Sequence, residues 1–426
     1  MEENQILTQR AVLVGLYQGL KDEFDIRESM NELAELTLAA GAEVADIIIQ
    51  NKASIEAATF IGAGKVEEVK MAIQDTESNI VIFNDELSGA QIRNLENLLE
   101  TTVIDRTALI LDIFAVRAQT KIAKLQVELA QLRYRASRLT GLGASLSRTG
   151  GGIGTRGPGE QKLEIDRRRI NERIDEIRKQ IKESEKNRTV QRKLRKKMEV
   201  PVVALVGYTN AGKSSILNYF INHSIEGEPD KQVFEKDMLF ATLDTFARRI
   251  VLEDKKEFIL TDTVGFVSKL PHSIIDAFKA TLEEALGADI LLHVVDASND
   301  SYKMQMEVTK QVLNELHAGD KEMITVFNKM DLVPDKVIGD LEESVHISAK
   351  TGENIALLVE KIKTHLFSHM KKVIFVIPYT DGKAASYICE TYKVDKIDHL
   401  EMGTYIETEV SEADYNKYKH YLKIEE

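Results

Sequence analysis

The sequence predicts a multidomain α/β protein, and three observations carry that expectation. Apolar runs of strand length alternate with helix-like segments in residues 1–116 and again in residues 200–370, the order typical of parallel sheets. Between them, residues 117–199 show a helical repeat with a glycine-rich interruption at 141–159. The last residues, 371–426, combine short strand-like and helix-like runs. We therefore expect an N-terminal parallel α/β domain, a helical hairpin, a second α/β domain and a small α+β domain.

Residues 1–116 are expected to form the first parallel sheet. Strands are predicted at 11–17, 44–50, 80–83 and 102–104, and helices at 27–40, 66–73 and 88–99. The stretch from Gly62 to Lys65 resembles a phosphate-binding loop, but Thr59 replaces the first glycine and Val66 follows the lysine. We interpret it as a tight turn into a helix, with a second nucleotide or RNA-phosphate contact as the weaker alternative.

Residues 117–199 are expected to form the hairpin. Apolar residues recur at spacings of three and four between Thr120 and Leu139, and again on one face of a longer segment from Glu160 to about Met198. The interruption at 141–159 contains eight glycines. Antiparallel pairing of the two helices would place it at the far end. The interruption is then a loop that makes contact, either with RNA or with the second α/β domain. The alternative is a surface loop without a partner.

The charge of the chain is unevenly distributed. The net charge is −13, yet residues 117–199 hold 23 Lys+Arg against 10 Asp+Glu. An acidic protein with one basic segment indicates a local contact with a polyanion, and the alternative is a solvated helical surface. Cations at a helix C-terminus also offset the helix dipole, but five in six residues exceed that need. The candidate RNA contacts are Arg148, Arg156, Arg192, Lys193, Arg195, Lys196 and Lys197.

A P-loop pattern, G-x-x-x-x-G-K-[ST], opens the second α/β domain after a strand-like run at 202–206. Its glycines allow backbone amides to surround phosphate oxygens at a helix N-terminus. Lys213 can reach the β- and γ-phosphates, and the Ser214 hydroxyl can bind magnesium. The candidate phosphate-binding residues are Gly207, Tyr208, Thr209, Asn210, Ala211, Gly212, Lys213, Ser214 and Ser215.

Three further motifs follow predicted strands, where α/β sheets bind ligands. The Asp331 carboxylate can accept hydrogen bonds from N1 and N2 of guanine, whereas adenine lacks this donor pair. Asp262 can hold magnesium through water, and Gly265 can approach the γ-phosphate. The candidate residues are Asp262, Thr263, Val264 and Gly265, then Asn328, Lys329, Met330 and Asp331, then Ser348, Ala349 and Lys350. Four motifs in this order predict a GTP-binding domain of the Ras-like P-loop class that hydrolyses GTP.

Composition excludes several other classes of protein. A single cysteine, Cys389, rules out a disulfide framework and fits a reducing compartment. No apolar run approaches the ~20 residues that a membrane span needs, and the polar first ten residues do not form a signal peptide. We expect a cytoplasmic monomer without DNA as a partner, and we leave peripheral membrane association open.

Over nearly its full length the chain resembles the HflX family of translational GTPases. Beyond the nucleotide motifs, the resemblance is carried by residues 64–68, 103–107, 109–114, 124–132 and 151–160. It implies the four-part architecture above, GTP and Mg²⁺ as ligands, and binding to the large ribosomal subunit and its rRNA near the peptidyl-transferase and intersubunit region. It also implies splitting or rescue of stalled or idle ribosomes under stress, with the basic hairpin as the rRNA contact.

The resemblance also assigns a first switch, with two departures from the common pattern. The switch corresponds to Phe240, Ala241, Thr242, Leu243 and Asp244. Thr242 would bind magnesium and, with Lys213 and Gly265, act in catalysis, although Thr245 could replace it if the functional hydroxyl came later. Phe266 stands where many GTPases place a water-orienting glutamine, so slow hydrolysis and stimulation by the large subunit are expected. Asn210 resembles the asparagine of potassium-stimulated GTPases, which makes K⁺ there a hypothesis.

Three other functions use the same motifs. A GTPase in rRNA or ribosome maturation often carries an RNA-binding module after the nucleotide domain, and residues 371–426 show none. An NTP-driven RNA remodeller would use the N-terminal domain and hydrolyse ATP even after Lys213→Ala. A GTP-loaded scaffold would not turn over GTP on ribosomes.

Overall fold

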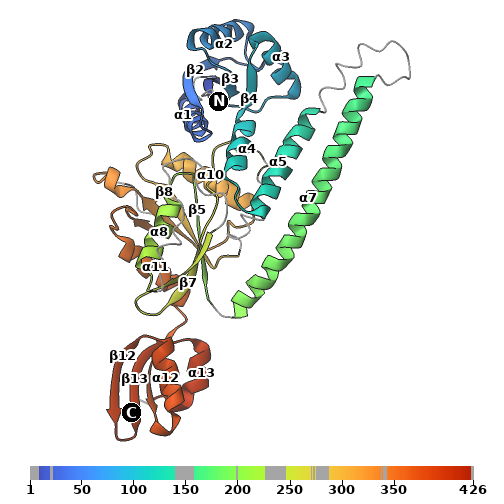
Figure 1. The fold of residues 1–426 in the computed structure, drawn as a ribbon. Helices are drawn as coiled ribbons and strands as arrows, with labels where there is room; N and C mark the ends of the chain where they lie inside the picture. The colour runs from blue at the N-terminus through green and yellow to red at the C-terminus, as the bar shows by residue number, and fades with distance from the viewer. Residues whose placement is uncertain are drawn as a thin grey trace, which may run out of the picture.

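The chain is organised around separate sheets, which the computed structural model in Figure 1 shows as three bodies along the molecule. The structure describes residues 9–19, 23–139, 158–197, 200–225, 246–269, 271, 274, 287–336, 338 and 343–423. The side chains of 23–25, 158–163 and 185–197 lie outside this description. The multidomain α/β class predicted from the sequence is confirmed.

The N-terminal domain is a four-stranded parallel sheet of order β2-β1-β3-β4. Its strands are β1 (Arg10–Tyr17), β2 (Glu43–Asn51), β3 (Ile80–Phe83) and β4 (Thr102–Asp105), and its helices are α1 (Glu23–Ala39), α2 (Ala63–Thr76), α3 (Gly89–Leu99) and α4 (Arg106–Arg117). Side chains of β1 alternate between two cores. Leu13 packs with α1 and α4, and Val14 with α2 and α3, as expected for a parallel sheet covered on both faces.

The Gly62 loop forms the start of α2, as the sequence suggests. Lys65 pairs with Glu68 one turn later, at 2.7 Å between Nζ and Oε2. The Gly62 amide donates to Gln50 Oε1 at 3.0 Å. The Lys65 ammonium and the Gly62 amide thus both have partners within the N-terminal domain. This favours the interpretation of the loop as a tight turn into a helix.

The hairpin consists of α5 (Lys121–Leu139) and α7 (Pro158–Lys197), which run side by side in Figure 1. Its seam contains Leu125 and Leu129 from α5 against Ile174, Ile177 and Ile181 from α7. A bidentate ion pair flanks the seam, with Arg173 donating to Glu128 at 2.8 and 3.1 Å.

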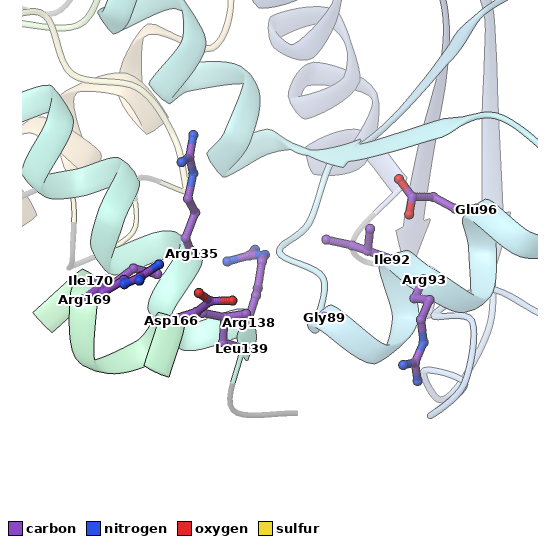
Figure 2. Close-up of a pocket in the computed structure, with 10 residues that line it drawn as sticks. All are labelled: Gly89, Ile92, Arg93, Glu96, Arg135, Arg138, Leu139, Asp166, Arg169 and Ile170. Atoms are coloured by element: carbon purple, nitrogen blue, oxygen red, sulfur yellow. The ribbon is translucent and has the colours of Figure 1, made fainter. Parts of the chain in front are cut away.

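The opposite face of α5 belongs to the N-terminal domain. Ala123, Val127 and Ala130 pack into the same core as α1 and α4. A cavity of about 580 Å³ lies where α3, α5 and α7 meet (Figure 2). The hairpin is therefore an extension of the N-terminal domain and does not stand apart from it.

The second α/β domain has a six-stranded sheet of order β10-β9-β8-β5-β7-β6, parallel except for the edge strand β6. Its elements are β5 (Val202–Gly207), α8 (Lys213–His223), β6 (Phe246–Val251), β7 (Glu257–Asp262), β8 (Ile290–Asp296), α10 (Tyr302–Glu315), β9 (Met323–Asn328), a 3₁₀ turn (Met330–Leu332), β10 (Ser344–His346) and α11 (Ile355–Phe367). The edge strand β6 begins at Phe246, which pairs with Asp262 on β7.

The C-terminal domain is a three-stranded antiparallel sheet of order β11-β13-β12. Its strands are β11 (Lys371–Ile377), β12 (Val394–Leu400) and β13 (Gly403–Val410), and helices α12 (Gly382–Thr391) and α13 (Glu412–Tyr418) accompany them. Lys256 ties it to the preceding domain through an ion pair with Glu409 at 2.8 Å. Among the described residues, no helix is long and apolar enough to cross a membrane.

We predict that Ile177→Ala destabilises the hairpin by about 2–5 kcal/mol, because Ile177 is fully buried in the seam and its loss leaves a cavity. The matched control is Ile165→Ala on the same helix, where the side chain is 42% exposed, with an expected change within about 0.5 kcal/mol. Urea unfolding followed by far-UV circular dichroism measures both. Equal losses would contradict the seam.

Candidate functional site

The P-loop connects β5 to α8 and needs glycine at two positions. Gly207 has φ +147°, and a Cβ there would lie 2.2 Å from the carbonyl oxygen of Val294 on β8. Gly212 has φ +93°, and a Cβ there would lie 2.1 Å from Asn328 Nδ2. Any side chain would therefore force the loop away from the strands that frame it. Between these glycines, Asn210 also adopts a left-handed conformation, with φ +58°.

Lys213 is buried inside this loop. Its Nζ donates to the carbonyl oxygens of Gly207 at 3.1 Å and Tyr208 at 2.6 Å. Burial lowers the pKa of Lys213 to about 8, and Asp262 opposes that shift. The Ser214 hydroxyl donates to Asp262 Oδ2 at 2.6 Å. A cation, a hydroxyl and a carboxylate thus meet at the N-terminus of α8.

The end of β7 lies directly beside the loop. The Thr209 amide donates to the carbonyl of Phe266 at 2.8 Å, and the Phe266 amide donates to the carbonyl of Gly207 at 3.1 Å. A Cβ on Gly265 would lie 2.7 Å from Thr209 Cα and 3.0 Å from Lys213 Nζ. The Phe266 ring is buried in the core that contains Tyr208. The Phe266 side chain is thus part of the hydrophobic core. Because Gly265 has no side chain, space remains next to the Lys213 ammonium group.

The base-recognition motifs brace one another and the P-loop. Asn328 Nδ2 donates to the carbonyl of Ala211 at 3.0 Å, and Asn328 Oδ1 accepts from the Ala349 amide at 2.9 Å. Asp331 Oδ1 accepts from the Ser348 hydroxyl at 2.7 Å. Lys329 Nζ pairs with Asp296 at 2.7 Å. The Ser348 side chain therefore fixes the Asp331 carboxylate, a contact that the sequence analysis missed.

Not every predicted residue is part of this arrangement. Ser215, Thr263, Val264, Met330 and Lys350 lie in or beside the same loops, and Thr263 Oγ1 donates to the carbonyl of Leu205 at 2.6 Å. Phe240, Ala241, Thr242, Leu243 and Asp244 lie outside the described residues, as do Arg148 and Arg156. Arg192, Lys193, Arg195, Lys196 and Lys197 belong to the last turns of α7, where side chains are outside the description.

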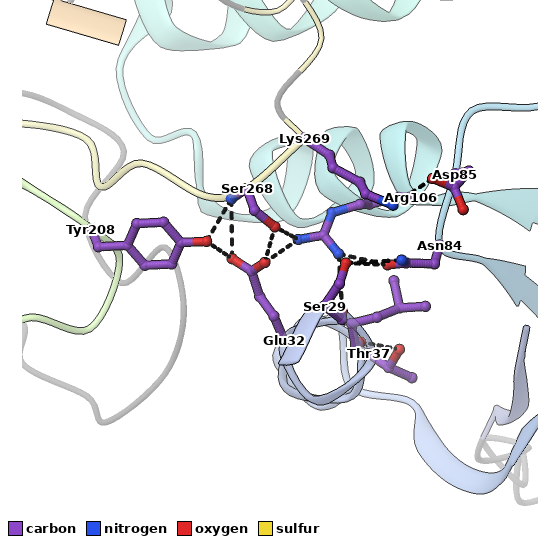
Figure 3. A network of polar contacts seen from close by, with 10 residues as sticks. Ser29, Glu32, Thr37, Asn84, Asp85, Arg106, Tyr208, Ser268 and Lys269 are labelled. Carbon is purple, nitrogen blue, oxygen red and sulfur yellow. Dashed lines mark hydrogen bonds and ion pairs between the residues drawn. The ribbon is translucent and has the colours of Figure 1, made fainter. Parts of the chain in front are cut away.

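A polar network joins the nucleotide loops to the N-terminal domain (Figure 3). Glu32 on α1 pairs with the buried guanidinium of Arg106 on α4 and accepts from the Tyr208 hydroxyl. The Ser268 amide, just past Gly265, donates to the Tyr208 oxygen at 2.6 Å, and Arg106 donates to Ser268 Oγ at 3.0 Å. Burial and the neighbouring Glu32 carboxylate raise the pKa of Tyr208, so the phenol keeps its proton.

Apolar contacts accompany this network. Val264 and Val267 are buried in the same core as α1 and α4 of the N-terminal domain. The segment after β7 therefore belongs to both domains. Sequence reasoning missed this network, because its members are far apart in the chain and no motif spans them.

Models of three known families match successive stretches of the chain. A model described as GTP-binding GTPase N-terminal matches residues 27–115. One described as GTP-binding GTPase middle region matches 117–195, and one described as 50S ribosome-binding GTPase matches 202–329. A solved structure, a GTP-binding protein from Sulfolobus solfataricus in complex with GDP, is 22% identical with a TM-score of 0.44 and covers 85% of this chain and 99% of that one.

Curated relatives match nearly end to end. GTPase HflX of Caldanaerobacter subterraneus is 47% identical, covering 96% of this chain and 93% of the relative. GTPase HflX of Lacrimispora saccharolytica is 46% identical, covering 94% and 93%. GTPase HflX of Escherichia coli is 40% identical, covering 91% and 90%. With this identity over the whole architecture, including the domain that carries the P-loop, the chain belongs to the HflX family of GTPases.

Proposed function

We propose that this GTPase is a switch that binds the large ribosomal subunit and acts on stalled or idle ribosomes, splitting or rescuing them under stress. One observation supports it above the others: Tyr208 of the P-loop and Ser268 beyond Gly265 both hydrogen-bond Glu32 of the N-terminal domain. That domain shares a core with α5 of the hairpin. A change at the γ-phosphate would thus reach the basic hairpin through continuous contacts.

The residues at the phosphate end fit GTP with Mg²⁺. The Ser214 hydroxyl and the Asp262 carboxylate are hard oxygen donors already in contact, the ligand type that magnesium prefers. When bound, magnesium would neutralise charge on the β- and γ-phosphates. Lys213 would turn from its carbonyl acceptors toward the phosphate, Gly265 would approach it, and Thr242 would complete the site. Phe266 orients no water, so turnover alone is slow and the large subunit stimulates it.

The hairpin is the part best suited to rRNA. Phosphate binding requires cations more than sequence reading, and residues 117–199 hold the positive excess of the chain. Arg148, Arg156 and the five cations of 192–197 are the proposed contacts. The family model described as 50S ribosome-binding GTPase supports the choice of subunit. We propose that the protein acts as a cytoplasmic monomer.

We predict that Asp331→Asn changes base preference. The side-chain amide keeps one acceptor, which can still pair with N1, and replaces the other acceptor with a donor. This donor would face the N2 amino group of guanine without a partner, whereas the C2 carbonyl of xanthine can accept from it. GTP affinity is expected to fall about 100-fold or more, and affinity for xanthosine triphosphate to rise. Nucleotide titrations by calorimetry measure both. Asp335→Asn is the control, since Asp335 is exposed in the next turn, and the same change there should leave both affinities intact.

A potassium ion at Asn210 is proposed to assist hydrolysis. Asn210 lines a cavity of about 110 Å³, and Glu28, Glu32, Glu35 and Asp296 also line it. Glu32 is paired with Arg106 and Asp296 with Lys329, and the acidic lining as a whole favours a cation close to the P-loop. Turnover is expected to be faster in KCl than in NaCl at one ionic strength, with GTP affinity unchanged. Equal turnover would exclude the potassium role.

The proposed function is tested by co-sedimentation with purified ribosomal subunits. We expect the chain to pellet with the large subunit in the presence of a non-hydrolysable GTP analogue and to remain in solution with GDP. Binding should weaken steeply along a salt series, because phosphate contacts release counterions. Lys213→Ala, which removes the phosphate-binding cation, should behave like the GDP state. Binding without subunit preference or nucleotide dependence would overturn the proposal.

A further inference from the structure

The cavity at the meeting point of α3, α5 and α7 is lined by none of the residues of the nucleotide loops. Its volume, about 580 Å³, lies within the range typical of ligand sites, about 300–1,000 Å³. Ten residues line it: Gly89, Ile92, Arg93 and Glu96 from α3, Arg135, Arg138 and Leu139 from α5, and Asp166, Arg169 and Ile170 from α7. Figure 2 shows α3 facing the two hairpin helices across the opening.

The walls are held at a fixed spacing. Gly89, in the first turn of α3, lies against the end of α5, and a Cβ there would meet the carbonyl oxygen of Arg138 at 2.6 Å. Ser88 caps α3 through a reciprocal pair of hydrogen bonds with Gln91. On the opposite side, Ile170 packs into the hairpin seam. The cavity is therefore built by close backbone contact and is not a gap between loose helices.

One wall carries a guanidinium that is fixed before any ligand arrives. Arg138 lies over the Tyr134 ring, with its Cζ atom 3.2 Å from the ring centroid, and pairs with the fully buried Asp105. Asp105 is itself held by the Tyr134 hydroxyl at 2.8 Å and by the Leu87 amide at 3.0 Å. The Arg138 side chain is 13% exposed, and the part that borders the cavity is held in place at little further cost in side-chain entropy.

The remaining lining supplies two other kinds of group. Ile92, Leu139 and Ile170 are apolar, whereas the arginines Arg135 and Arg169 are exposed. Two carboxylates, Glu96 and Asp166, stand among them and can accept hydrogen bonds from amino groups. The cavity thus combines an immobilised arginine, apolar contacts, exposed cations and a few acceptors. Together they match one chemical unit, which is a flat base joined to a phosphate.

We propose that this cavity holds a single unpaired RNA nucleotide. The base would pack against Arg138 and the apolar side chains, and its phosphates would meet Arg135 and Arg169. A paired base is excluded, because its faces are covered by stacking within the duplex. The proposal rests on the proposed function, in which the hairpin contacts rRNA, and adds to it a specific site for a base extruded from its helix.

The test measures binding of labelled RNA to the full chain by fluorescence anisotropy. We expect the double variant Arg135→Ala, Arg169→Ala to lower affinity for a short single-stranded RNA about tenfold. The matched control removes the same charge nearby, through Arg167→Ala and Arg168→Ala on exposed positions of α7 that do not line the cavity, and should change affinity less than about twofold. Replacing the bases by abasic positions should weaken wild-type binding and reduce the difference between wild type and the first variant.

Several outcomes would overturn the site. Equal losses in the two double variants would mean general charge attraction. Equal binding of a duplex of the same sequence, or no effect of abasic positions, would exclude base capture. Binding of a free nucleoside monophosphate that depends on Arg135 and Arg169, with no effect on the oligonucleotide, would assign the cavity to a small ligand.

Co-sedimentation separates this inference from the proposed function. If the wild type pellets with the large subunit and the Arg135 and Arg169 variants bind single-stranded RNA normally, the cavity assignment fails and the ribosomal function stands. If the variants lose RNA affinity but the wild type never pellets with a subunit, the cavity stands and the ribosomal function fails.

Discussion

The buried ion pair between Glu32 and Arg106 determines how the two large domains meet. Arg106 is only 2% exposed, and an uncompensated charge at that depth would cost about 3–5 kcal/mol. Glu32 satisfies it and, with its remaining acceptor capacity, binds Tyr208 and Ser268 across the interface. Compensation of one buried cation therefore fixes α1 and α4 against the P-loop, and the orientation of the hairpin follows from that.

The nucleotide site depends on a second constraint, which is the close approach of loops at one edge of the parallel sheet. Gly207, Gly212 and Gly265 all lie where a Cβ would collide with a neighbouring strand or loop. Asn328 then joins the P-loop to the Ala349 loop through both ends of its amide. Because each loop is held by another, the phosphate end and the base end of the site form a single rigid unit.

Local patterns in the sequence predict most of this architecture, and the reason is physical. Strand runs and helical repeats depend on residues that are close in the chain, so β3 occurs at 80–83 and the hairpin seam occurs as the spacing predicts. The P-loop is equally local. The Glu32 network and the Ser348–Asp331 hydrogen bond are not, since their partners meet only after folding. The first switch, at 240–244, lies outside the described residues, so its threonine remains a prediction.

The core shared by α1, α4 and Val267 has a consequence for how the chain is made. During synthesis the N-terminal domain leaves the ribosome first, and its sheet, helices and α5 can assemble from residues already present. The apolar surface that Val264 and Val267 cover stays open to water until the segment after β7 has been translated. The nascent protein thus keeps an apolar surface exposed while the hairpin and the first strands of the next domain are being synthesised.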